Sequence, residues 1–483
     1  MNGYSRTLAG LRVCVAGLGI SGPPAARVLA ELGAQVTAVD ERDDAERRAL
    51  ADKLTGLGIR VLLGAAATSA APAGTRLVVT SPGWQPDAPL LVAAAAAGIE
   101  VICDTELAWR LRPRLPGGRE QRWLAVTGTN GKTTTVRMLA LMLEAAGLRA
   151  VAAGNVGTSL MEVVTEPRPY EVVAAELSSY QLHWSSTIAP MAAAVLNVAA
   201  HHLDWHGSLD AYAAAKAKIL APGTIAIGNA DDARSSAMVT AAGSAGLAPR
   251  VVRFHLGEPS PGELGVTDGW LVDRAFGDTG TAAGVRLAQL AEVFPGQPPP
   301  HNVADALAAA ALARAYGVAA AAVGAGLAAF RPEPHRMALV ARLAGVDYVD
   351  DSKATNPHAA AAALGAYRSV VWIAGGLLKG AETDLDQLVT QAASRLRGVV
   401  LLGADRGKFA AALRRHAPQV PVVDVAGTDT GIMGMAVDAA SGMAEPGDTV
   451  LLAPAAQSFD LFRDYPARGD AFAAHVRRLE ARQ

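Results

Sequence analysis

The chain is organised around one short stretch, Val126-Thr127-Gly128-Thr129-Asn130-Gly131-Lys132-Thr133-Thr134. The apolar residues 123–126 predict a strand before it, and we expect a helix from Thr133 to Ala146 after it. Gly128 and Gly131 let the backbone bend so that successive N–H groups point inward, and the helix start adds the positive end of its dipole. The stretch therefore predicts a loop that binds the phosphates of a nucleoside triphosphate.

Two side chains of this loop carry its expected chemistry. Lys132 is expected to reach the outer phosphates, and the Thr133 hydroxyl is expected to take one position on a magnesium ion. Val126 departs from the general pattern, which has a glycine at that position. An ordinary glycine-rich turn before a buried helix is the structural alternative.

Length and composition set the frame for the rest of the chain. A chain of 483 residues is too long for one hydrophobic core and predicts about three domains. The net charge of −2 gives no electrostatic case for binding nucleic acid or a membrane surface. Cys14 and Cys103 are the only cysteines, so we expect a reducing compartment without disulfides. Because the sequence shows neither a signal peptide nor a membrane-spanning segment, we expect a cytoplasmic protein.

The first predicted domain, residues 1–115, contains Gly17-Leu18-Gly19-Ile20-Ser21-Gly22 between a predicted strand over 11–16 and a helix. A second predicted strand, 35–39, ends in Asp40, the acidic residue that a dinucleotide site has at this distance. An NAD-dependent oxidoreductase is therefore one reading. The same geometry can hold the diphosphate of a nucleoside diphosphate sugar, with Asp40 and Arg42 near the nucleoside.

A second turn is expected at the same crevice. The predicted strand 77–80 leads into Ser81-Pro82-Gly83, and an ordinary tight turn is the alternative explanation for this tripeptide. Beyond it, residues 112–119 are rich in proline and glycine and predict the first linker.

In the second predicted domain, residues 116–331, polar residues follow the predicted strands. Glu176 comes directly after the strand 170–175, and His202 lies shortly after the strand 192–196. Because the carboxyl ends of parallel strands meet at one edge, both side chains could converge on the metal of the phosphate loop. Lys216 lies in an alanine-rich helix predicted over Ser208–Leu220, where composition alone predicts a solvated lysine. Asn302 begins another helix and could contact a base edge or cap the helix.

The third predicted domain, residues 332–483, follows a proline-broken joint at 330–336. Strand-like segments at 347–350, 370–374, 399–402 and 449–452 alternate with helical ones, which predicts a second Rossmann-like sheet. Four cationic or hydroxyl-bearing residues follow these strands and suit an anionic small molecule: Lys353, Thr355, Lys379 and Ser458. The predicted fold is thus α/β, with a Rossmann-like domain on each side of a central phosphate-loop domain.

The motifs together resemble the Mur ligases of peptidoglycan synthesis, over nearly the whole chain. The stretches that carry the resemblance are 127–133, 154–157, 176–179, 197–204, Lys216, 301–302, 335–336 and 351–356. The resemblance implies an ATP-driven amide ligation by a monomer, most like the branch that adds D-glutamate to UDP-N-acetylmuramoyl-L-alanine. ATP would phosphorylate the L-alanyl carboxylate, and the glutamate amine would attack the acyl phosphate.

The resemblance also implies residue roles. The catalytic residues would be Lys132, Glu176, His202 and Lys216, with two magnesium ions held by Thr133, Glu176, His202 and a carbamylated Lys216. ATP would contact Gly128, Thr129, Asn130, Gly131, Lys132, Thr133, Thr134, Asn302, Arg336 and Asp351. The UDP-linked acceptor would contact Gly19, Ile20, Ser21, Asp40, Arg42, Ser81, Gly83, Asn155 and Ser178. The incoming glutamate would contact Lys353, Thr355, Lys379, Ser458 and Tyr465.

Four alternatives stay open at this point. The chain could be a Mur-type ligase for another amino acid such as L-glutamate, or a folylpolyglutamate-type ligase. It could also be a degenerate ligase that only senses UDP sugars, or the oxidoreductase suggested by the first glycine loop.

Overall fold

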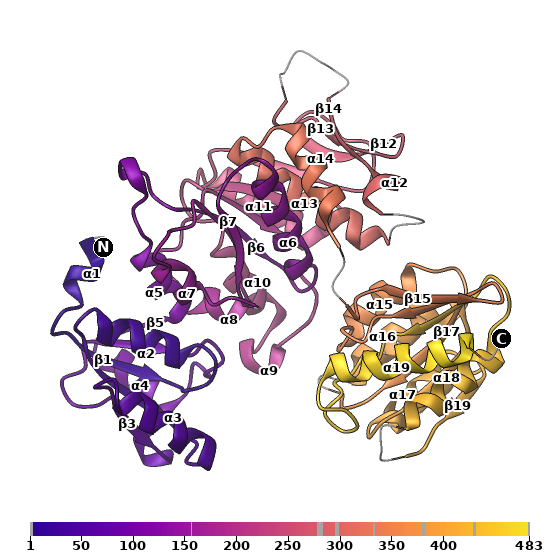
Figure 1. Ribbon diagram of the computed structural model, residues 1–483, viewed down its shortest axis with the longest axis horizontal. Helices are drawn as coiled ribbons and strands as arrows, with labels where there is room; N and C mark the ends of the chain where they lie inside the picture. The colour runs from indigo at the N-terminus through magenta and orange to yellow at the C-terminus, as the bar shows by residue number, and fades with distance from the viewer. Residues whose placement is uncertain are drawn as a thin grey trace. The chain divides into compact units, whose positions relative to one another are not determined.

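The computed structural model describes residues 3–155, 157–277, 284–294, 299–331, 334–378, 382–427 and 431–481. Within these ranges the strands form three sheets with helices on their faces, so the predicted α/β class is confirmed (Figure 1). The chain forms two compact bodies, one of Met1–Pro298 with Asn302–Phe330 and one of Pro299–His301 with Arg331–Gln483. The first two sheets lie in the first body and the third sheet lies in the second.

Each sheet lies within one of the three predicted domains, whose boundaries at 115/116 and 331/332 stay predictions. None of the described helices combines the length and the apolar character needed to cross a membrane.

The first sheet is parallel, with the strand order β3-β2-β1-β4-β5. On its central strand β1, Val13 and Val15 belong to one apolar core, and Cys14 and Ala16 belong to another. A strand covered on both faces needs apolar residues throughout, which explains the continuous apolar run at 13–16. The strands are β1 Arg12–Ala16, β2 Gln35–Asp40, β3 Arg60–Leu63, β4 Leu77–Thr80 and β5 Glu100–Cys103, and the helices are α1 Gly3–Thr7, α2 Gly22–Glu31, α3 Ala45–Thr55, α4 Pro89–Ala96 and α5 Asp104–Leu111.

The second sheet has the strand order β7-β8-β6-β9-β10-β11-β12-β13-β14. Pairing is parallel from β7 to β12 and antiparallel from β12 to β14. The strands are β6 Arg122–Thr127, β7 Ala150–Gly154, β8 Val172–Glu176, β9 Ala192–Val195, β10 Ile225–Asn229, β11 Val251–Phe254, β12 Glu263–Thr267, β13 Trp270–Asp273 and β14 Val285–Gln289.

Helices cover both faces of the second sheet. Its helices are α6 Lys132–Ala145, α7 Leu160–Thr165, α8 Ser179–His183, α9 Leu203–His206, α10 Leu209–Ala217, α11 Ala233–Ser244, α12 Leu290–Val293, α13 Pro300–Tyr316 and α14 Ala320–Ala329. One face packs on α6, α13 and α14, in a core that includes Leu124 and Val126 of β6. The next β6 side chains, Trp123 and Ala125, point to the opposite face, as strand alternation requires.

That opposite face shares its apolar core with the first sheet. Trp123 belongs to the same cluster of buried residues as Leu107 and Leu111 of α5. The fully buried Glu106 carboxylate adds polar contacts, accepting hydrogen bonds from the Arg110 guanidinium at 2.8 Å and from the Thr187 N–H at 3.2 Å. The first two sheets are therefore joined by a continuous core and by a buried charge that is fully bonded.

The third sheet has the strand order β15-β16-β20-β17-β18-β19, with only β15 antiparallel to its neighbour. Its strands are β15 Ala338–Leu343, β16 Val346–Asp350, β17 Val370–Gly375, β18 Leu396–Leu402, β19 Val422–Asp424 and β20 Thr449–Leu452. Helices α15 Pro357–Gly365, α16 Glu382–Ala392 and α17 Arg406–His416 pack on one face, and α18 Ile432–Met443 and α19 Tyr465–Glu480 pack on the other.

The predicted elements differ from the observed ones mainly at their ends. Strands predicted at 77–80 and 449–452 coincide with β4 and β20. The helix predicted for Ser208–Leu220 is shorter, because α10 ends at Ala217 and the chain continues in turns. Ser208 caps this helix, since its side chain accepts a hydrogen bond from the Ala211 N–H.

A buried ion pair at the start of the antiparallel part of the second sheet gives a stability prediction. Asp273 is fully buried, and its carboxylate accepts from the Arg314 guanidinium at 2.8 Å and from the N–H groups of Ala275 and Phe276. We expect Asp273→Ala to lower the free energy of unfolding by about 3 kcal/mol or more, because it leaves a half-buried cation unpaired.

Chemical denaturation of the full chain measures this loss. The matched control is Asp210→Ala, which breaks an exposed pair with Arg234 and should change the same free energy by less than about 1 kcal/mol. Equal effects of the two variants would contradict the assignment of Asp273 as a core contact.

Candidate active site

The glycine-rich loop lies between β6 and α6, at the carboxyl edge of the second sheet. Gly131 has φ +84°, and a Cβ there would collide with the Asp305 carboxylate of α13. Gly128 is also closely packed, since a Cβ would lie 3.0 Å from the Leu196 Cβ. Helix α6 begins at Lys132, so the N–H groups of its first turn border the loop. Glycine is thus required at position 131 and closely accommodated at position 128, and the backbone suits an anion at a helix start.

The Glu176 carboxylate links two neighbouring strand ends to the loop. Its Oε2 accepts from the Thr133 hydroxyl at 2.8 Å, and its Oε1 accepts from the Asn155 side-chain amide at 3.1 Å. Glu176 is the last residue of β8 and is only 2% exposed, whereas Asn155 follows β7 and is exposed. Thr133 and Glu176 together present hard oxygen atoms of the kind that magnesium prefers.

Two lysines converge on one carbonyl oxygen beneath the loop. Lys132 Nζ donates to Gly128 O at 2.9 Å and to Thr129 O at 3.1 Å. Lys216 Nζ donates to the same Gly128 O at 2.8 Å, and the Lys216 residue is only 1% exposed. The prediction of a solvated lysine, which was based on composition, is therefore wrong. Burial and the Lys132 charge lower the Lys216 pKa well below its usual value, although Glu176 acts in the opposite direction. The fold therefore favours the neutral amine of Lys216.

The remaining loop residues are held by Asn197 and Tyr212, for which no role was predicted. Asn197 accepts from the Asn130 N–H at 2.9 Å with its side chain and from the Thr129 N–H at 3.0 Å with its carbonyl. The Thr129 hydroxyl lies 3.2 Å from the hydroxyl of Tyr212, a residue of α10. Asn197 was recognisable as a polar residue after a strand, but Tyr212 stands in an alanine-rich helix without any such signal.

His202 lies in a group of aromatic rings beside the loop. It has a left-handed backbone with φ +56°, directly before α9, and its ring is 4.8 Å from the Tyr180 ring. The neighbouring His206 has its pKa lowered to about 4, chiefly by burial, with His202 and Lys216 contributing through their charges. Across the described residues, no group of three or more His, Cys, Asp or Glu side chains could hold a metal. The metal-ligand roles of His202 and Lys216 stay predictions.

The glycine loop of the first sheet joins β1 to α2 and is closely packed. A Cβ at Gly17 would lie 2.7 Å from the Ser81 Oγ, and a Cβ at Gly22 would collide with the Gly17 carbonyl. Ser81 itself donates from its hydroxyl to Gly17 O at 3.1 Å. At the outer side of the loop, Gly19 is exposed and the Ile20 side chain is 93% exposed. The structure thus brings the glycine loop and the Ser81 turn together at one edge, as the sequence predicts.

Asp40 holds the shape of this loop. Its buried carboxylate accepts from the Leu18 N–H at 2.6 Å and from the Arg42 N–H at 2.9 Å. The exposed Arg42 guanidinium pairs with Asp44 at 2.6 Å. The predicted contacts of Asp40 and Arg42 with a nucleoside are not tested by these bonds and stay predictions.

The two glycine-rich edges of the first body are linked by Trp205. Its indole N–H, from α9, donates to the Gly83 carbonyl of the first domain at 3.3 Å. Nearby, Ser178 caps α8 and forms reciprocal hydrogen bonds with Gln181. Asn302 is buried within α13 rather than placed before it, so it does not cap that helix.

In the second body, Arg336 and Asp351 lie close together. The Asp351 carboxylate accepts from the Met337 N–H at 3.1 Å, and burial raises its pKa to about 7 while the Arg336 charge opposes that rise. The loop after β16 then turns back, with the Lys353 N–H donating to the His335 carbonyl and the Thr355 N–H donating to Lys353 O.

Residues predicted to contact the amino acid also meet in this body. Lys353 Nζ lies 5.8 Å from the centre of the Tyr465 ring, and Ser458 is buried. Lys379 lies outside the described residues. Arg468 of α19, absent from the predictions, is 1% exposed and donates to Ser352 O at 2.8 Å and to Ala456 O at 3.1 Å. It ties the two loops together, but a single arginine in a helix gives no sequence signal for that role.

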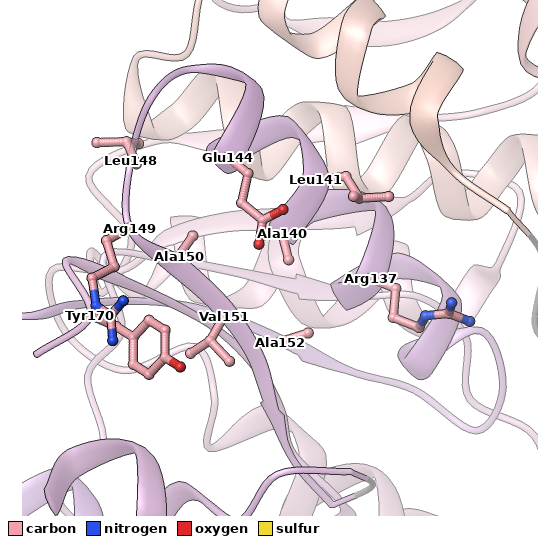
Figure 2. Close-up of a pocket in the computed structure, with 10 residues that line it drawn as sticks. All are labelled: Arg137, Ala140, Leu141, Glu144, Leu148, Arg149, Ala150, Val151, Ala152 and Tyr170. Atoms are coloured by element: carbon pink, nitrogen blue, oxygen red, sulfur yellow. The ribbon is translucent and has the colours of Figure 1, made fainter. Parts of the chain in front are cut away.

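A hollow of about 520 Å³ lies between α6 and β7 (Figure 2). Arg137 and Glu144 line it from α6, and the Arg149 guanidinium lies 4.4 Å from the centre of the Tyr170 ring. None of the predicted site residues lines this hollow, so it is separate from the phosphate loop.

Three family models match successive parts of the chain. Residues 11–103 match the MurD-like N-terminal domain of Mur ligases, residues 126–313 the Mur ligase middle domain, and residues 335–456 the glutamate ligase domain of Mur ligases.

Individual relatives match over almost the full length. The UDP-N-acetylmuramoylalanine–D-glutamate ligase of Thermobifida fusca is 60% identical, covering 98% of this chain and 99% of that protein. The ligase of the same name from Streptomyces avermitilis is 57% identical over 98% of this chain and 99% of its own. Among solved structures, MurF from Acinetobacter baumannii has a TM-score of 0.57 at 20% identity, covering 98% of this chain and 92% of that one, which supports the fold alone.

The close approach at Gly131 gives a test of the loop. We expect Gly131→Ala to weaken ATP binding at least about tenfold, because the added methyl group must displace either the loop or Asp305. Calorimetric titration of ATP into the full chain measures the effect.

The matched control is Gly147→Ala, which has a similar backbone angle of +80° after α6 but no atom within 4 Å of the added Cβ. It should cost about 1 kcal/mol of stability and leave ATP affinity unchanged. Unchanged affinity in Gly131→Ala would contradict the loop assignment.

Proposed function

This chain belongs to the Mur ligase family, and we propose that it joins D-glutamate to UDP-N-acetylmuramoyl-L-alanine in an ATP-dependent reaction. The names of relatives at 60% and 57% identity over almost the whole chain support this substrate pair. The activity uses nucleotide substrates, so we assign the enzyme to the cytoplasm. The monomeric state is proposed from the family resemblance alone.

One observation supports the chemistry most directly, namely the connected set of Lys132, Thr133, Glu176 and Lys216 around Gly128. It combines a phosphate-binding backbone, a cation and a hydroxyl–carboxylate pair at the carboxyl edge of one sheet. Such a set suits phosphoryl transfer, in which positioning and charge neutralisation do most of the work. It is poorly suited to hydride transfer, which requires neither a magnesium-type oxygen pair nor a phosphate-facing lysine.

The proposed reaction has two steps. A carboxylate oxygen of the L-alanyl end attacks the γ-phosphorus of ATP, ADP leaves, and an acyl phosphate of the acceptor forms. The amine of D-glutamate then attacks the acyl carbon, phosphate leaves, the amide forms, and the amine proton goes to solvent. Lys132 neutralises phosphate charge, and the loop N–H groups hold the phosphates in place. No protein nucleophile is required.

The Thr133–Glu176 pair fits a magnesium ion that accompanies ATP. Its two oxygen atoms lie 2.8 Å apart and are both hard donors. A bound magnesium ion would reduce the charge on the transferred phosphoryl group. Thr133 and Glu176 are the residues that would hold it.

A second magnesium position is proposed at His202 and Lys216. An ammonium group cannot bind a cation, so Lys216 must change chemically to serve. Its neutral amine can add to carbon dioxide, forming an N–C bond and releasing one proton, and the resulting carbamate carries carboxylate oxygens. The lowered pKa of Lys216 supports this modification because only the neutral amine reacts.

The substrate-contacting residues are proposed in three groups, one each for the acceptor, ATP and glutamate. The acceptor would use the Gly17–Gly22 loop with Ser81 and Gly83, together with Asn155 and Ser178. Arg336 and Asp351 would contact ATP, while glutamate would use Lys353, Thr355, Ser458, Tyr465 and Lys379, the last of which lies outside the described residues. The buried Ser458 and the Lys353–Tyr465 proximity support the glutamate group.

Release of ADP and phosphate from ATP tests the proposed activity. The purified chain is incubated with UDP-N-acetylmuramoyl-L-alanine and, in turn, D-glutamate, L-glutamate, D-aspartate or no amino acid. We expect stoichiometric ADP and phosphate only with D-glutamate. Turnover restricted to L-glutamate would reassign the amino acid, and NADH binding without ATP hydrolysis would point to an oxidoreductase.

Lys132→Ala provides the matched variant for this assay. We expect a fall in kcat on the order of 1000-fold with nearly unchanged affinity for the UDP-linked acceptor, because the ammonium group acts on the phosphates. Turnover equal to that of the native enzyme would refute the central role of the loop.

Chemical rescue tests the proposed carbamate at Lys216. We expect Lys216→Ala to lose most activity and to recover a measurable part of it when a short carboxylic acid is added, since the acid can supply the missing carboxylate oxygens. Lys218→Ala is the control, because Lys218 bonds to the carbonyls of His183 and Ser185 instead, and it should need no rescue. Full activity of unaided Lys216→Ala would rule out the modification.

A further inference from the structure

Arg468, a buried arginine in the second body, has no part in the reaction proposed above. It is the fourth residue of α19 and is 1% exposed. Burying a guanidinium group is costly unless its N–H groups are bonded, so its place in the interior requires an explanation. Burial lowers the pKa of Arg468 to about 10, while Asp460 and Asp350 oppose the fall, so the side chain is positively charged at neutral pH.

Three hydrogen bonds from this guanidinium reach two different loops. Nε donates to the Ser352 hydroxyl at 3.0 Å, Nη2 donates to the Ser352 carbonyl at 2.8 Å, and Nη1 donates to the Ala456 carbonyl at 3.1 Å. All three acceptors are neutral. Because the guanidinium is planar and its donors have fixed directions, it fixes the position of one loop relative to the other.

These two loops carry most of the residues that are proposed to contact glutamate. Strands β16 and β20 pair in parallel, and the loops 351–356 and 453–458 follow them at the same edge of the third sheet. The first loop contains Lys353 and Thr355, and the second loop ends at Ser458. The spacing of the two loops therefore determines whether these side chains can act on one small molecule.

The first residue of α19 joins the same network. The Ser352 hydroxyl donates to the Tyr465 carbonyl at 2.8 Å while it accepts from Arg468. The Tyr465 ring in turn has Lys353 Nζ at 5.8 Å from its centre. One guanidinium is thus connected, directly or through one hydroxyl, to each segment that contributes a described residue to the proposed glutamate group.

The second loop holds a strained residue next to its Arg468 contact. Ala455 has φ +58°, a left-handed conformation that alanine rarely adopts. Its N–H donates to the Ala354 carbonyl of the first loop at 2.9 Å, and Arg468 bonds the carbonyl of the next residue. Strained backbone persists only where surrounding contacts hold it in place. Loss of the guanidinium would remove one of these two contacts.

Helix α19 has little room to carry Arg468 elsewhere. A Cβ at Gly469 would collide with the His335 ring and would lie 2.7 Å from Asp350 Oδ2. His335 is itself bonded to Asp350, with Nδ1 at 2.7 Å from Oδ2. Because the helix packs directly against the end of β16, the guanidinium has a defined position.

We propose that Arg468 is the positioning residue of the amino-acid site. Its guanidinium holds the loops 351–356 and 453–458 at the spacing that lets Lys353, Thr355 and Ser458 bind the carboxylates of one glutamate molecule. Arg468 itself does not touch the substrate and takes no part in bond making. The inference rests on the proposed function, because it requires glutamate at these two loops.

A positioning role and a purely structural role differ in their kinetic effect. The acceptor is assigned to loops of the first body, so loss of the Arg468 contacts should weaken the binding of glutamate and leave that of the acceptor unchanged. A role in folding alone would reduce stability and the amount of active enzyme, and would not select one substrate.

Steady-state kinetics of Arg468→Lys in the full chain tests the proposal. ADP release is measured while D-glutamate is varied, and again while UDP-N-acetylmuramoyl-L-alanine is varied. Lysine keeps the charge, but its nitrogen ends about one bond length short of the arginine Nη atoms and cannot bond both loops. We expect KM for D-glutamate to rise on the order of tenfold or more, with KM for the acceptor within about twofold and kcat within about threefold of the native values.

The matched control is Arg477→Lys, the same substitution at an exposed position of α19. It should leave kcat and both KM values unchanged, because its side chain lies outside the network of Arg468.

The outcomes separate the two claims. No ligation by the native protein would refute the proposed function itself. A native KM for D-glutamate in Arg468→Lys, with or without a fall in kcat, or equal rises in KM for both substrates, would overturn the inference about Arg468.

If Arg468→Lys fails a thermal-unfolding check, Ser352→Ala replaces it. Loss of this hydroxyl removes both the Arg468 Nε contact and the bond to the Tyr465 carbonyl. We expect a several-fold rise in KM for D-glutamate alone, and a native value in this variant would overturn the inference equally.

Discussion

Strands β6, β8 and β7 are adjacent and parallel, and their register places Val126 and Gly154 on either side of Glu176. The three strands therefore end at the same level of the sheet. The residues that follow them come within hydrogen-bonding distance of one another. Thr133 and Asn155 both reach Glu176 for this reason, although they are far apart in the sequence. The phosphate loop and its oxygen pair both depend on this single alignment. The pairing of the strands thus determines which side chains can meet at the site.

Much of this could be predicted, because the signals were local. Apolar runs mark strands covered on both faces, and β4 and β20 were predicted to the residue. A polar residue directly after such a run lies at the carboxyl edge by necessity, which is how Glu176 was found. The glycines of both loops were predictable for a similar reason, since a Cβ at Gly17, Gly22 or Gly131 has no room. Family resemblance added the order of the motifs and the substrates.

What escaped prediction depends on contacts between distant segments. Tyr212 and Arg468 come from helices whose sequences show only helical character, and their partners lie in other elements. The burial of Lys216 was missed because flanking alanines say nothing about which face of a helix is covered. In each case the sequence around the residue has helical character. It did not predict which other element that side of the helix packs against.

The core that includes Trp123 and Leu107 runs from the first sheet into the second, and Glu106 is bonded across the same boundary. The first body therefore contains two sheets but does not divide into two independently folding parts. Cutting the chain at the first linker would leave a carboxylate and a large apolar surface without partners, so neither fragment would be a faithful version of its part. For anyone seeking a minimal piece to crystallise, label or screen, the smallest unit that keeps the acceptor loop and the phosphate loop intact is the whole first body.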